Sequence, residues 1–566
     1  MALVLSGSTT ILTHATDTSN IGLGANAVDS ITTGDYNVGI GDNAGTAITT
    51  GTMNVALGVN TFDANTTGSY NTAIGKSALG DNSTGGNNTA VGFVALAANT
   101  TASNNTAVGY YALTANTTGY ENTAVGQNSM DANTTGHSNS GFGRSSLGSN
   151  TTGDYNTGIG YASLGANTTA NNNTAVGYYS LVTNTTGSLN TAVGGDTLKL
   201  NTTGAQNTAL GMYALNANTT ASLNTAVGYV AMLSNTTGIN NVAMGAYALD
   251  ANTTGGSNTA LGYQALTANT TAAYNTAVGK DSFKANTTGE HGTAIGNAAL
   301  LANTTGNNNV AIGSEALAAN TTASNNVAVG TEALKVNTTG DSNVAVGDDV
   351  LKSNTTGTNN TANGYQSLYS NTTASNNTAI GYQSLYYNTT GGSNTAMGRH
   401  ALVANTIGQQ NTAVGKDSLF SNTIGGSQVA IGWEALKDCT TANENTAVGF
   451  RSGQNITTGS NNTSVGGKSG EEVTTGYDNI TIGQRSGYDV TTGYKNICIG
   501  ESTIIGTASG NNRIVIGSGL QSAGANTVTF GKNTGSDRVY NVYTSNATWI
   551  RTSDERVKKD IATNTD

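Results

Sequence analysis

The sequence predicts an all-β fold in which one short unit is stacked many times into a parallel β-solenoid. Glycine recurs at every seventeenth residue from Gly24 to Gly517, which is thirty positions in one register, and the next step, to Gly531, shortens to fourteen. A fixed period of this kind is typical of solenoids, in which each repeat packs only on its neighbours. With 566 residues, no proline and 9% charged residues, the chain resembles neither an ordinary enzyme domain nor a charged disordered tail.

The unit from Asn105 to Glu121 defines seventeen columns, with Asn105 as column one. Columns two to four, here Thr106 to Val108, carry β-branched and small residues, which predict a short strand. We expect columns two and four to face inward. We also expect a corner at the glycine of column five, as at Gly109 and Gly262, and a second bend at column fifteen. Two short strands and two bends per coil then give a flattened β-roll of about thirty coils.

Columns nine and twelve exchange their side chains along the array. Column nine is Leu through most of the chain, while column twelve is Asn in twenty-two successive coils from Asn65 to Asn422. Near the ends, Gly stands in column nine beside Ile or Val in column twelve, as at Gly45 and Ile48. Because a large side chain in one column accompanies a small or polar one in the other, we infer that both occupy the same interior volume.

This exchange indicates how the repeated segment Asn-Thr-Thr-Gly, in columns twelve to fifteen, folds. A surface turn is the simpler interpretation, but β-branched residues avoid positive φ, so the exchange favours an internal asparagine ladder. Asn201 and Asn303 should then be buried, with each amide bonded to the coils above and below. Cys439 stands in the same column and fits an inward-facing site.

The core of each coil is thin, so stability must come from stacking. Columns three and eight are mostly Ala or Ser, small enough for a second backbone to approach, and this favours a parallel bundle of chains that buries these faces. At about 4.8 Å per strand layer, thirty coils predict a shaft about 140 Å long.

Charge and composition argue against several classes of partner and site. The net charge of −11 leaves no basic stripe, so we expect no nucleic acid. No signal peptide and no apolar run long enough to cross a membrane are found, which predicts synthesis in a cytosol and no membrane insertion. Cys439 and Cys498 are 59 residues apart, not a multiple of seventeen, so no disulfide is implied.

Neither a metal, a cofactor nor an enzymatic site is expected, because histidines are isolated on separate coils and acidic residues are scattered. The histidines are His14, His137, His291 and His400.

Two segments of the repeat resemble a known family. The stretches from Asn104 to Gly109 and from Asn479 to Gly483 are similar to the Asn-Ser-Val-Ala-Ile-Gly motif in the head domain of trimeric autotransporter adhesins. The resemblance implies a left-handed parallel β-roll in an intertwined homotrimer. The coils of that family are shorter, and neither its secretion signal nor its membrane anchor is found here.

A second resemblance lies at the C-terminus. The stretch from Trp549 to Ile561 is similar to the opening of the self-cleaving intramolecular chaperone domain of phage tail spikes and fibres. That family trimerises through this domain, registers its chains and cuts before a serine with a Ser–Lys dyad, whose positions Ser553 and Lys558 match. A serine hydroxyl needs a base, and a lysine of lowered pKa can serve. Only fourteen residues follow from Ser553, so we do not assume cleavage, and a charged, solvated tail is the alternative.

Together these features predict a structural and adhesive trimeric fibre shaft of a virus particle, located in a tail fibre or appendage. Its partners would be its own copies, other virion proteins and a host-surface receptor, with a glycan as one candidate class. The expected segments are an N-terminal cap or attachment segment over 1–19, the shaft over 20–517, a short coil and neck over 518–552, and the start of the chaperone domain over 553–566.

Two alternatives remain open for the function. One is a cellular surface adhesin. The other is a surface that binds ice or a crystal through the threonines of columns thirteen and fourteen, such as Thr100 and Thr101. Adjacent residues on a strand face opposite sides, so only one of these rows can be exposed.

The variable columns are where a receptor would be recognised, and column six is rich in aromatic residues. Exposed rings can stack on sugars or cover a neighbouring coil. The candidates for receptor binding are Tyr110, Tyr161, Tyr178, Tyr229, Tyr263, Tyr365, Tyr382 and Trp433.

Overall fold

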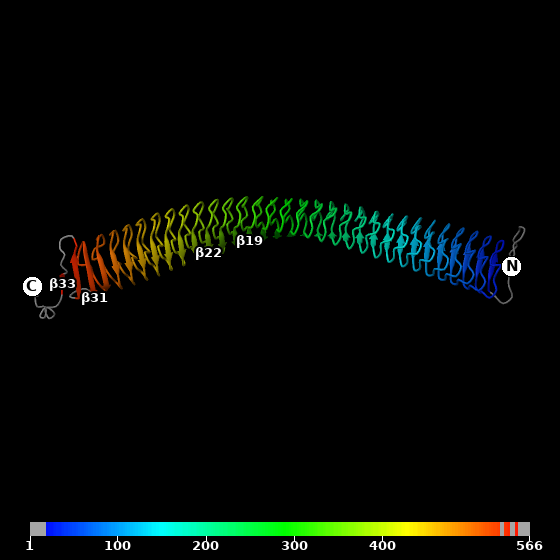
Figure 1. Cartoon of the computed structure of the whole chain (residues 1–566), viewed down its shortest axis with the longest axis horizontal. Coiled ribbons are helices and arrows are strands. Elements are labelled where there is room, and N and C mark those ends of the chain that lie inside the picture. The colour runs from blue at the N-terminus through cyan, green and yellow to red at the C-terminus, as the bar shows by residue number, and fades with distance from the viewer. Residues whose placement is uncertain (1–18, 533–536, 544–549, 553–566) are drawn as a thin grey trace, which may run out of the picture. The chain divides into compact units, whose positions relative to one another are not determined.

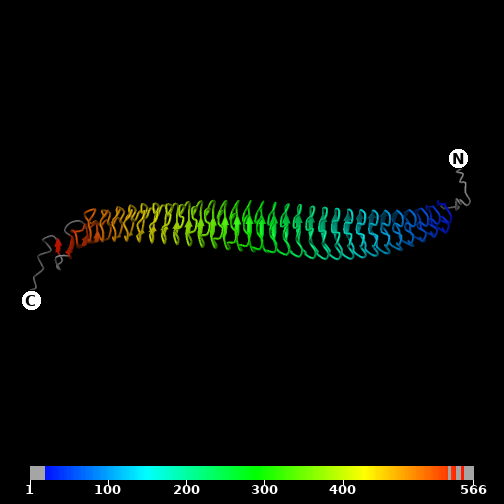
Figure 2. The same cartoon turned by 90° about the horizontal axis from the view of Figure 1, so that it is seen from above.

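A computed structural model describes residues 19–532, 537–543 and 550–552, and this part of the chain contains strands, turns and bends without a helix. The chain divides into two compact units, one ending at Thr288 and the other beginning at Gly289. Within each unit, successive strands lie side by side (Figure 1, Figure 2). The predicted fold class, a parallel β-solenoid of about thirty coils, is confirmed.

The strands of the first unit are three residues long and occupy columns two to four. They are β1 (Ile21–Leu23), β2 (Val38–Ile40), β3 (Val55–Leu57), β4 (Thr72–Ile74), β5 (Thr89–Val91), β6 (Thr106–Val108), β7 (Thr123–Val125), β8 (Ser140–Phe142), β9 (Thr157–Ile159), β10 (Thr174–Val176), β11 (Thr191–Val193), β12 (Thr208–Leu210), β13 (Thr225–Val227), β14 (Val242–Met244), β15 (Thr259–Leu261) and β16 (Thr276–Val278).

The second unit repeats this arrangement and ends in longer strands. Its strands are β17 (Thr293–Ile295), β18 (Val310–Ile312), β19 (Val327–Val329), β20 (Val344–Val346), β21 (Thr361–Asn363), β22 (Thr378–Ile380), β23 (Thr395–Met397), β24 (Thr412–Val414), β25 (Val429–Ile431), β26 (Thr446–Val448), β27 (Thr463–Val465), β28 (Ile480–Ile482), β29 (Ile497–Ile499), β30 (Ile514–Ser518), β31 (Thr527–Lys532), β32 (Arg538–Val542) and β33 (Ile550–Thr552).

The seventeen-residue period is the pairing register of the strands. Ala107 of β6 pairs with Ala124 of β7, and both neighbouring columns keep the same offset in a parallel ladder. At the C-terminal end, Gly517 pairs with Gly531, which confirms that the shorter fourteen-residue step is still one coil. The strands β31 to β33 then pair antiparallel. This pairing continues the ladder beyond β31, where the parallel coils end.

The column-five glycines form the predicted corners. Gly109 has a φ of 143°, and a Cβ on it would lie 2.4 Å from the carbonyl oxygen of Gly126 in the next coil. Gly262 is alike, with a φ of 139° and a Cβ that would lie 2.5 Å from the carbonyl oxygen of Gly279. The glycine therefore serves both the left-handed corner and the close approach of stacked backbones.

The inward and outward faces of the strands are the reverse of the prediction. Ala107, in column three, is fully buried, while Thr106 and Val108, in columns two and four, are partly exposed. The reason is the thinness of the coil. At Gly141, another column-three residue, even a Cβ would lie only 2.7 Å from Ser129 Oγ of the preceding coil, so the serine would have to shift to admit a methyl group.

The same finding corrects the role of columns three and eight. Their small side chains, such as Ala107 and Ala112, pack inside their own coil and are not available to a second chain. The residues that face outward from each strand are instead the β-branched ones of columns two and four.

The prediction of two strands per coil was also wrong, because only columns two to four form a strand in the repeated coils. Columns six to eleven form successive turns. Tyr111 and Leu113, in columns seven and nine, have left-handed φ values of 53° and 54°, and Glu121 in column seventeen has 57°. Residues with such φ values cannot continue an extended strand.

Candidate functional site

The internal asparagine ladder of column twelve is confirmed. Asn201 is fully buried, and its Nδ2 donates to Asn184 Oδ1 at 2.8 Å and to the Gly204 carbonyl at 2.9 Å. Its Oδ1 accepts from Asn218 Nδ2 at 2.7 Å. Asn303 is buried as well. These amides satisfy one another along the stack, so they build the coil and are not available to a ligand.

The structure also explains the exchange between columns nine and twelve. A Cβ placed on Gly45 would lie 2.8 Å from Ile48 Cδ1, and one on Gly453 would lie 3.0 Å from Ile456 Cδ1. The two columns therefore compete for one volume, as predicted. The backbone does not explain the exchange, because column nine has a left-handed φ both at Gly45, with 63°, and at Leu113, with 54°.

Column one forms a second asparagine ladder, which the sequence analysis missed. The backbone N–H of Asn105 donates to Asn88 Oδ1 at 3.0 Å, and Asn105 Nδ2 donates to the Gly119 carbonyl at 2.9 Å. That carbonyl also accepts from Asn116 Nδ2 of column twelve at 2.8 Å. The two ladders thus meet at column fifteen in coils that have Asn in both columns. The signal available in the sequence was the repeated Asn directly before most strands.

One coil replaces both ladder residues at once. Gln428 stands in column one and Cys439 in column twelve, with Gln428 Nε2 lying 3.4 Å from Cys439 Sγ and also donating to the Ala442 carbonyl. The longer amide reaches toward the space that the smaller thiol leaves. In the preceding coil, Asn422 Oδ1 is buried without a hydrogen-bond donor. Elsewhere in the ladder the Asn of the next coil supplies this donor, but that position is occupied by Cys439.

Both cysteines are free and buried. Burial away from water disfavours the thiolate, and this raises the pKa of Cys439 and that of Cys498 to about 12. The thiols therefore act as small apolar groups inside the coil.

An uncharged face runs along the strands of each unit, and we call it the apolar stripe. It consists of columns two and four of β1 to β30. Column two holds Thr, Val, Ile or Ser, and column four holds Val, Ile, Leu, Met or Phe in every strand but one. The exception is Asn363 in β21. Side chains of column four are well exposed, as shown by Leu210 at 47% and Ile431 at 40%.

The threonine rows behave as predicted, with only one of them exposed. Thr117 Oγ1 of column thirteen donates to the carbonyl of Thr134 in the next coil at 3.1 Å, and this bond recurs along the stack. Thr118, in column fourteen, is exposed. Column fourteen therefore presents a single outward row of threonines.

All eight aromatic candidates of column six are exposed, between 39% and 53%. They do not form one site. Tyr161 stacks on Tyr178 with centroids 5.6 Å apart, and Tyr365 stacks on Tyr382 at the same distance. Trp433 lies 5.3 Å from the ring of Phe450. These rings cover neighbouring coils and still present an outer face.

The other three candidates also contact aromatic neighbours. Tyr110 stacks on Phe93 at 5.4 Å, whereas Tyr229 and Tyr263 both contact Tyr247, at 5.6 and 6.1 Å. Cations lie over several rings, including Arg399 over Tyr382 and Lys416 over Trp433.

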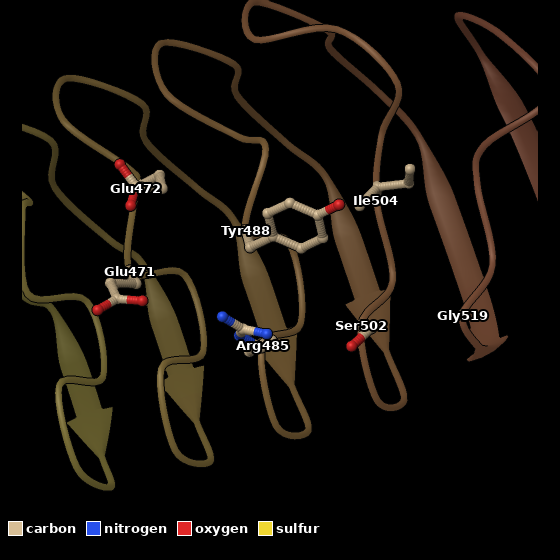
Figure 3. A pocket seen from close by; sticks show the side chains of 7 residues that line it. All are labelled: Glu471, Glu472, Arg485, Tyr488, Ser502, Ile504 and Gly519. Atoms are coloured by element: carbon tan, nitrogen blue, oxygen red, sulfur yellow. The ribbon is translucent and has the colours of Figure 1, made fainter.

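A groove of about 440 Å³ lies near the C-terminal end of the second unit, on the turns of columns seven to eleven. In Figure 3, Arg485 and Tyr488 lie between Glu471 and Glu472 of the preceding coil and Ser502 of the following one. Ile504 and Gly519 complete the lining. This groove could not be identified from the sequence, because its residues come from four different columns of four coils.

The groove combines charge with an exposed ring. Glu471 is paired with Lys468 at 3.2 Å, and Glu472 accepts from Asn455 Nδ2 at 3.4 Å. The backbone N–H of Arg485 donates to the Gly467 carbonyl, but its guanidinium has no ion pair or hydrogen bond in the part of the chain that is described. Tyr488 is 45% exposed. An unpaired guanidinium and carboxylates beside an open ring can donate to and accept from the hydroxyl groups of a ligand.

Ser553 and Lys558 lie outside the described residues, as does the predicted N-terminal segment apart from Ser19. Among the described residues, no three of His, Cys, Asp and Glu are grouped so that they could hold a metal ion. His137 Nε2 lies 3.4 Å from Asp154 Oδ2 without a third such group. Nor does the described chain contain a helix with the length and apolar character needed to span a bilayer.

Comparison with protein-family models and with curated proteins finds no match to this chain.

Proposed function

We propose that the chain is the shaft of a homotrimeric adhesive fibre, in which the apolar stripes of three copies pack together. The observation that supports this best is the stripe itself. None of the column-two and column-four residues in β1 to β30 is charged, although the chain carries 53 charged residues, 21 basic and 32 acidic. A long exposed apolar face of this kind marks an interaction surface.

The period of the stripe favours a second copy as the partner. Its side chains repeat once per coil, at the spacing of about 4.8 Å between paired strands. A partner that covers the whole stripe must repeat at the same spacing over the same length. Another copy of this chain meets that requirement.

The size of the stripe is sufficient for a stable interface. The sixteen strands of the first unit, each about 4.8 Å high and about 10 Å wide, present about 770 Å² of face. Stable protein interfaces bury about 800 Å² per partner. Each unit therefore presents a face close to that size.

The trimeric number and the viral setting rest on the two sequence resemblances. The motif from Asn104 to Gly109 supports an intertwined trimer, and the stretch from Trp549 to Ile561 supports a phage-type tail fibre. Within such a fibre, the column-six rings and the groove at Arg485 are the surfaces that would contact a host receptor, with glycans as the expected class. Trimerisation would raise the avidity of weak contacts.

The mass of the purified chain in solution tests this proposal. We expect a particle about three times 56.8 kDa by analytical ultracentrifugation, and a monomer would overturn the trimer. The variant Ile431→Lys places a charge on the stripe and should lower the mass, because burying an unpaired ammonium is costly. Thr458→Lys, in the exposed column fourteen, is the matched control and should keep the mass of the parent.

A second candidate function has one observation in its favour, the outward threonine row of column fourteen. Such a row could bind ice or a crystal surface. Thermal hysteresis measured on the purified chain decides between the two, because a fibre shaft should show none. Activity that is lost in Thr118→Val together with Thr135→Val would favour surface binding over the fibre.

A further inference from the structure

A periodic apolar stripe leaves the alignment of its copies weakly specified. If one copy slips by one coil, Val448 of β26 meets a residue equivalent to Val465 of β27, and almost every other contact is reproduced. Apolar contact is not directional, so it distinguishes the two alignments only at the ends of the stripe. A feature that occurs once in the stripe can distinguish them more strongly.

Asn363 is such a feature. It is the single polar residue in column four among β1 to β30, and it pairs in the ladder with Val346 of β20 on one side and Ile380 of β22 on the other. Its side chain is exposed, and it has no hydrogen-bond partner in the described part of the chain. Nothing within its own coil therefore accounts for an amide at this position.

We infer that Asn363 sets the register between copies of this chain. The inference rests on the proposed packing of the stripes. In register, the Asn363 amides of neighbouring copies meet, and each amide carries both donors and acceptors, so identical side chains can bond to one another. After a slip of one coil, each amide faces Val346 or Ile380 of the neighbour and is buried without a partner. A single asparagine in an apolar seam specifies register in coiled coils for the same reason.

The test compares how readily two kinds of full-length chain assemble with each other. The first keeps Asn363, and the second carries Val346→Asn with Asn363→Val, which moves the amide by one coil. Both also carry Thr446→Cys, a column-two position on the stripe, and each kind has a different affinity tag. Cys439 and Cys498 are buried, so the new thiol is the one in the described chain that can cross-link readily.

The chains are co-expressed and oxidised. We then measure the yield of disulfides that join residue 446 of two chains with different tags. Two differently tagged chains that both keep Asn363 give the reference yield. We expect a mixed pair, one unshifted and one shifted chain, to give at least about tenfold fewer of these disulfides. If the mixed pair packs in register, its amides are buried unpaired, and if it slips by one coil, the amides meet but the thiols at residue 446 are separated. Two shifted chains should give the reference yield, which shows that the double variant folds and assembles.

Equal yields for the mixed and the matched pairs would overturn the role of Asn363. Because the same particles are first weighed by analytical ultracentrifugation, this result is distinct from a failure of the proposed function. Monomers at that step contradict the fibre itself, whereas trimers with unselective pairing contradict only the assignment of register to Asn363.

Discussion

At the scale of single residues, the interior of the coil holds a closed asparagine ladder beside buried Ala and Leu side chains. Asn201 makes three side-chain hydrogen bonds, two within the column-twelve ladder and one to a column-fifteen carbonyl. A buried amide is favourable only when its donors and acceptors are paired. The ladder therefore stabilises the stack only while it is continuous.

We expect Asn201→Ala to lower the local free energy of unfolding by about 3 kcal/mol, because the change leaves Asn184 Oδ1 without its donor and opens a cavity. Hydrogen exchange of the coils around residue 201, followed by mass spectrometry, measures this loss. Thr203→Ala, on the exposed column fourteen of the same coil, should cost less than about 0.5 kcal/mol. Equal effects of the two variants would contradict the ladder's role.

The buried thiols predict a loss of stability at alkaline pH. Burial raises the pKa of Cys439 and Cys498 from 9.0 to about 12, so the unfolded chain ionises first as the pH rises. Their stabilising contribution is complete below about pH 9 and is lost between about pH 9 and 12. Urea denaturation at pH 8 and pH 10.5 should show this fall. The double variant Cys439→Ala and Cys498→Ala should show a smaller fall, and an unchanged fall would contradict the assignment.

At the scale of the coil, substitutions are coupled in pairs. Gln428 and Cys439 replace two asparagines in one coil, as Gly45 and Ile48 replace a leucine and an asparagine in another. In both coils the two side chains share an interior volume. A coil therefore tolerates a change in one column when the other compensates.

This coupling can be measured in the coil of Gln428. The double variant Gln428→Asn and Cys439→Asn should stabilise that coil by about 1 kcal/mol, because the new amide can donate to Asn422 Oδ1. Cys439→Asn alone should destabilise it, since Gln428 Nε2 already lies 3.4 Å from Cys439 Sγ. A double-mutant cycle by hydrogen exchange gives the coupling, and additive single effects would contradict the shared volume.

The coil also shows what the sequence could and could not predict. The glycine period predicted the strand register, and the exchange at Gly45 and Ile48 predicted the buried ladder, because both are relations between positions. The facing of Ala107 and Val108 was predicted the wrong way round. Hydrophobicity favours Val for the interior, but in most coils the width of the coil, which the sequence does not state, places the smaller Ala in column three.

The groove at Arg485 escaped prediction for a related reason. Its lining depends on side chains from four coils and on the turn that each column takes, whereas the column pattern describes one coil at a time. The second ladder was missed because Asn before a short strand is also typical of a turn. The partner that covers the apolar stripe could not be predicted from columns of one chain either, because it depends on how several chains assemble.

At the scale of the whole molecule, the charged residues lie outside the surface that is proposed to join the copies. The chain carries a net charge of −11, so three copies carry three times that charge, yet the stripe proposed to join them has none. Interactions between like-charged copies oppose association, and salt screens them. Apolar burial, by contrast, does not depend on screening.

The proposed trimer should therefore withstand salt. We expect the mass of the particle to be the same at about 50 mM and about 1 M sodium chloride, where the screening length falls to about 3 Å. If ion pairs between copies held the fibre together, high salt would release monomers, and ultracentrifugation would show a mass near 56.8 kDa. Ile431→Lys provides the matched comparison, because its added charges repel one another at the stripe. High salt should restore part of the assembly that this variant loses at low salt, whereas the parent should be assembled at both salt concentrations.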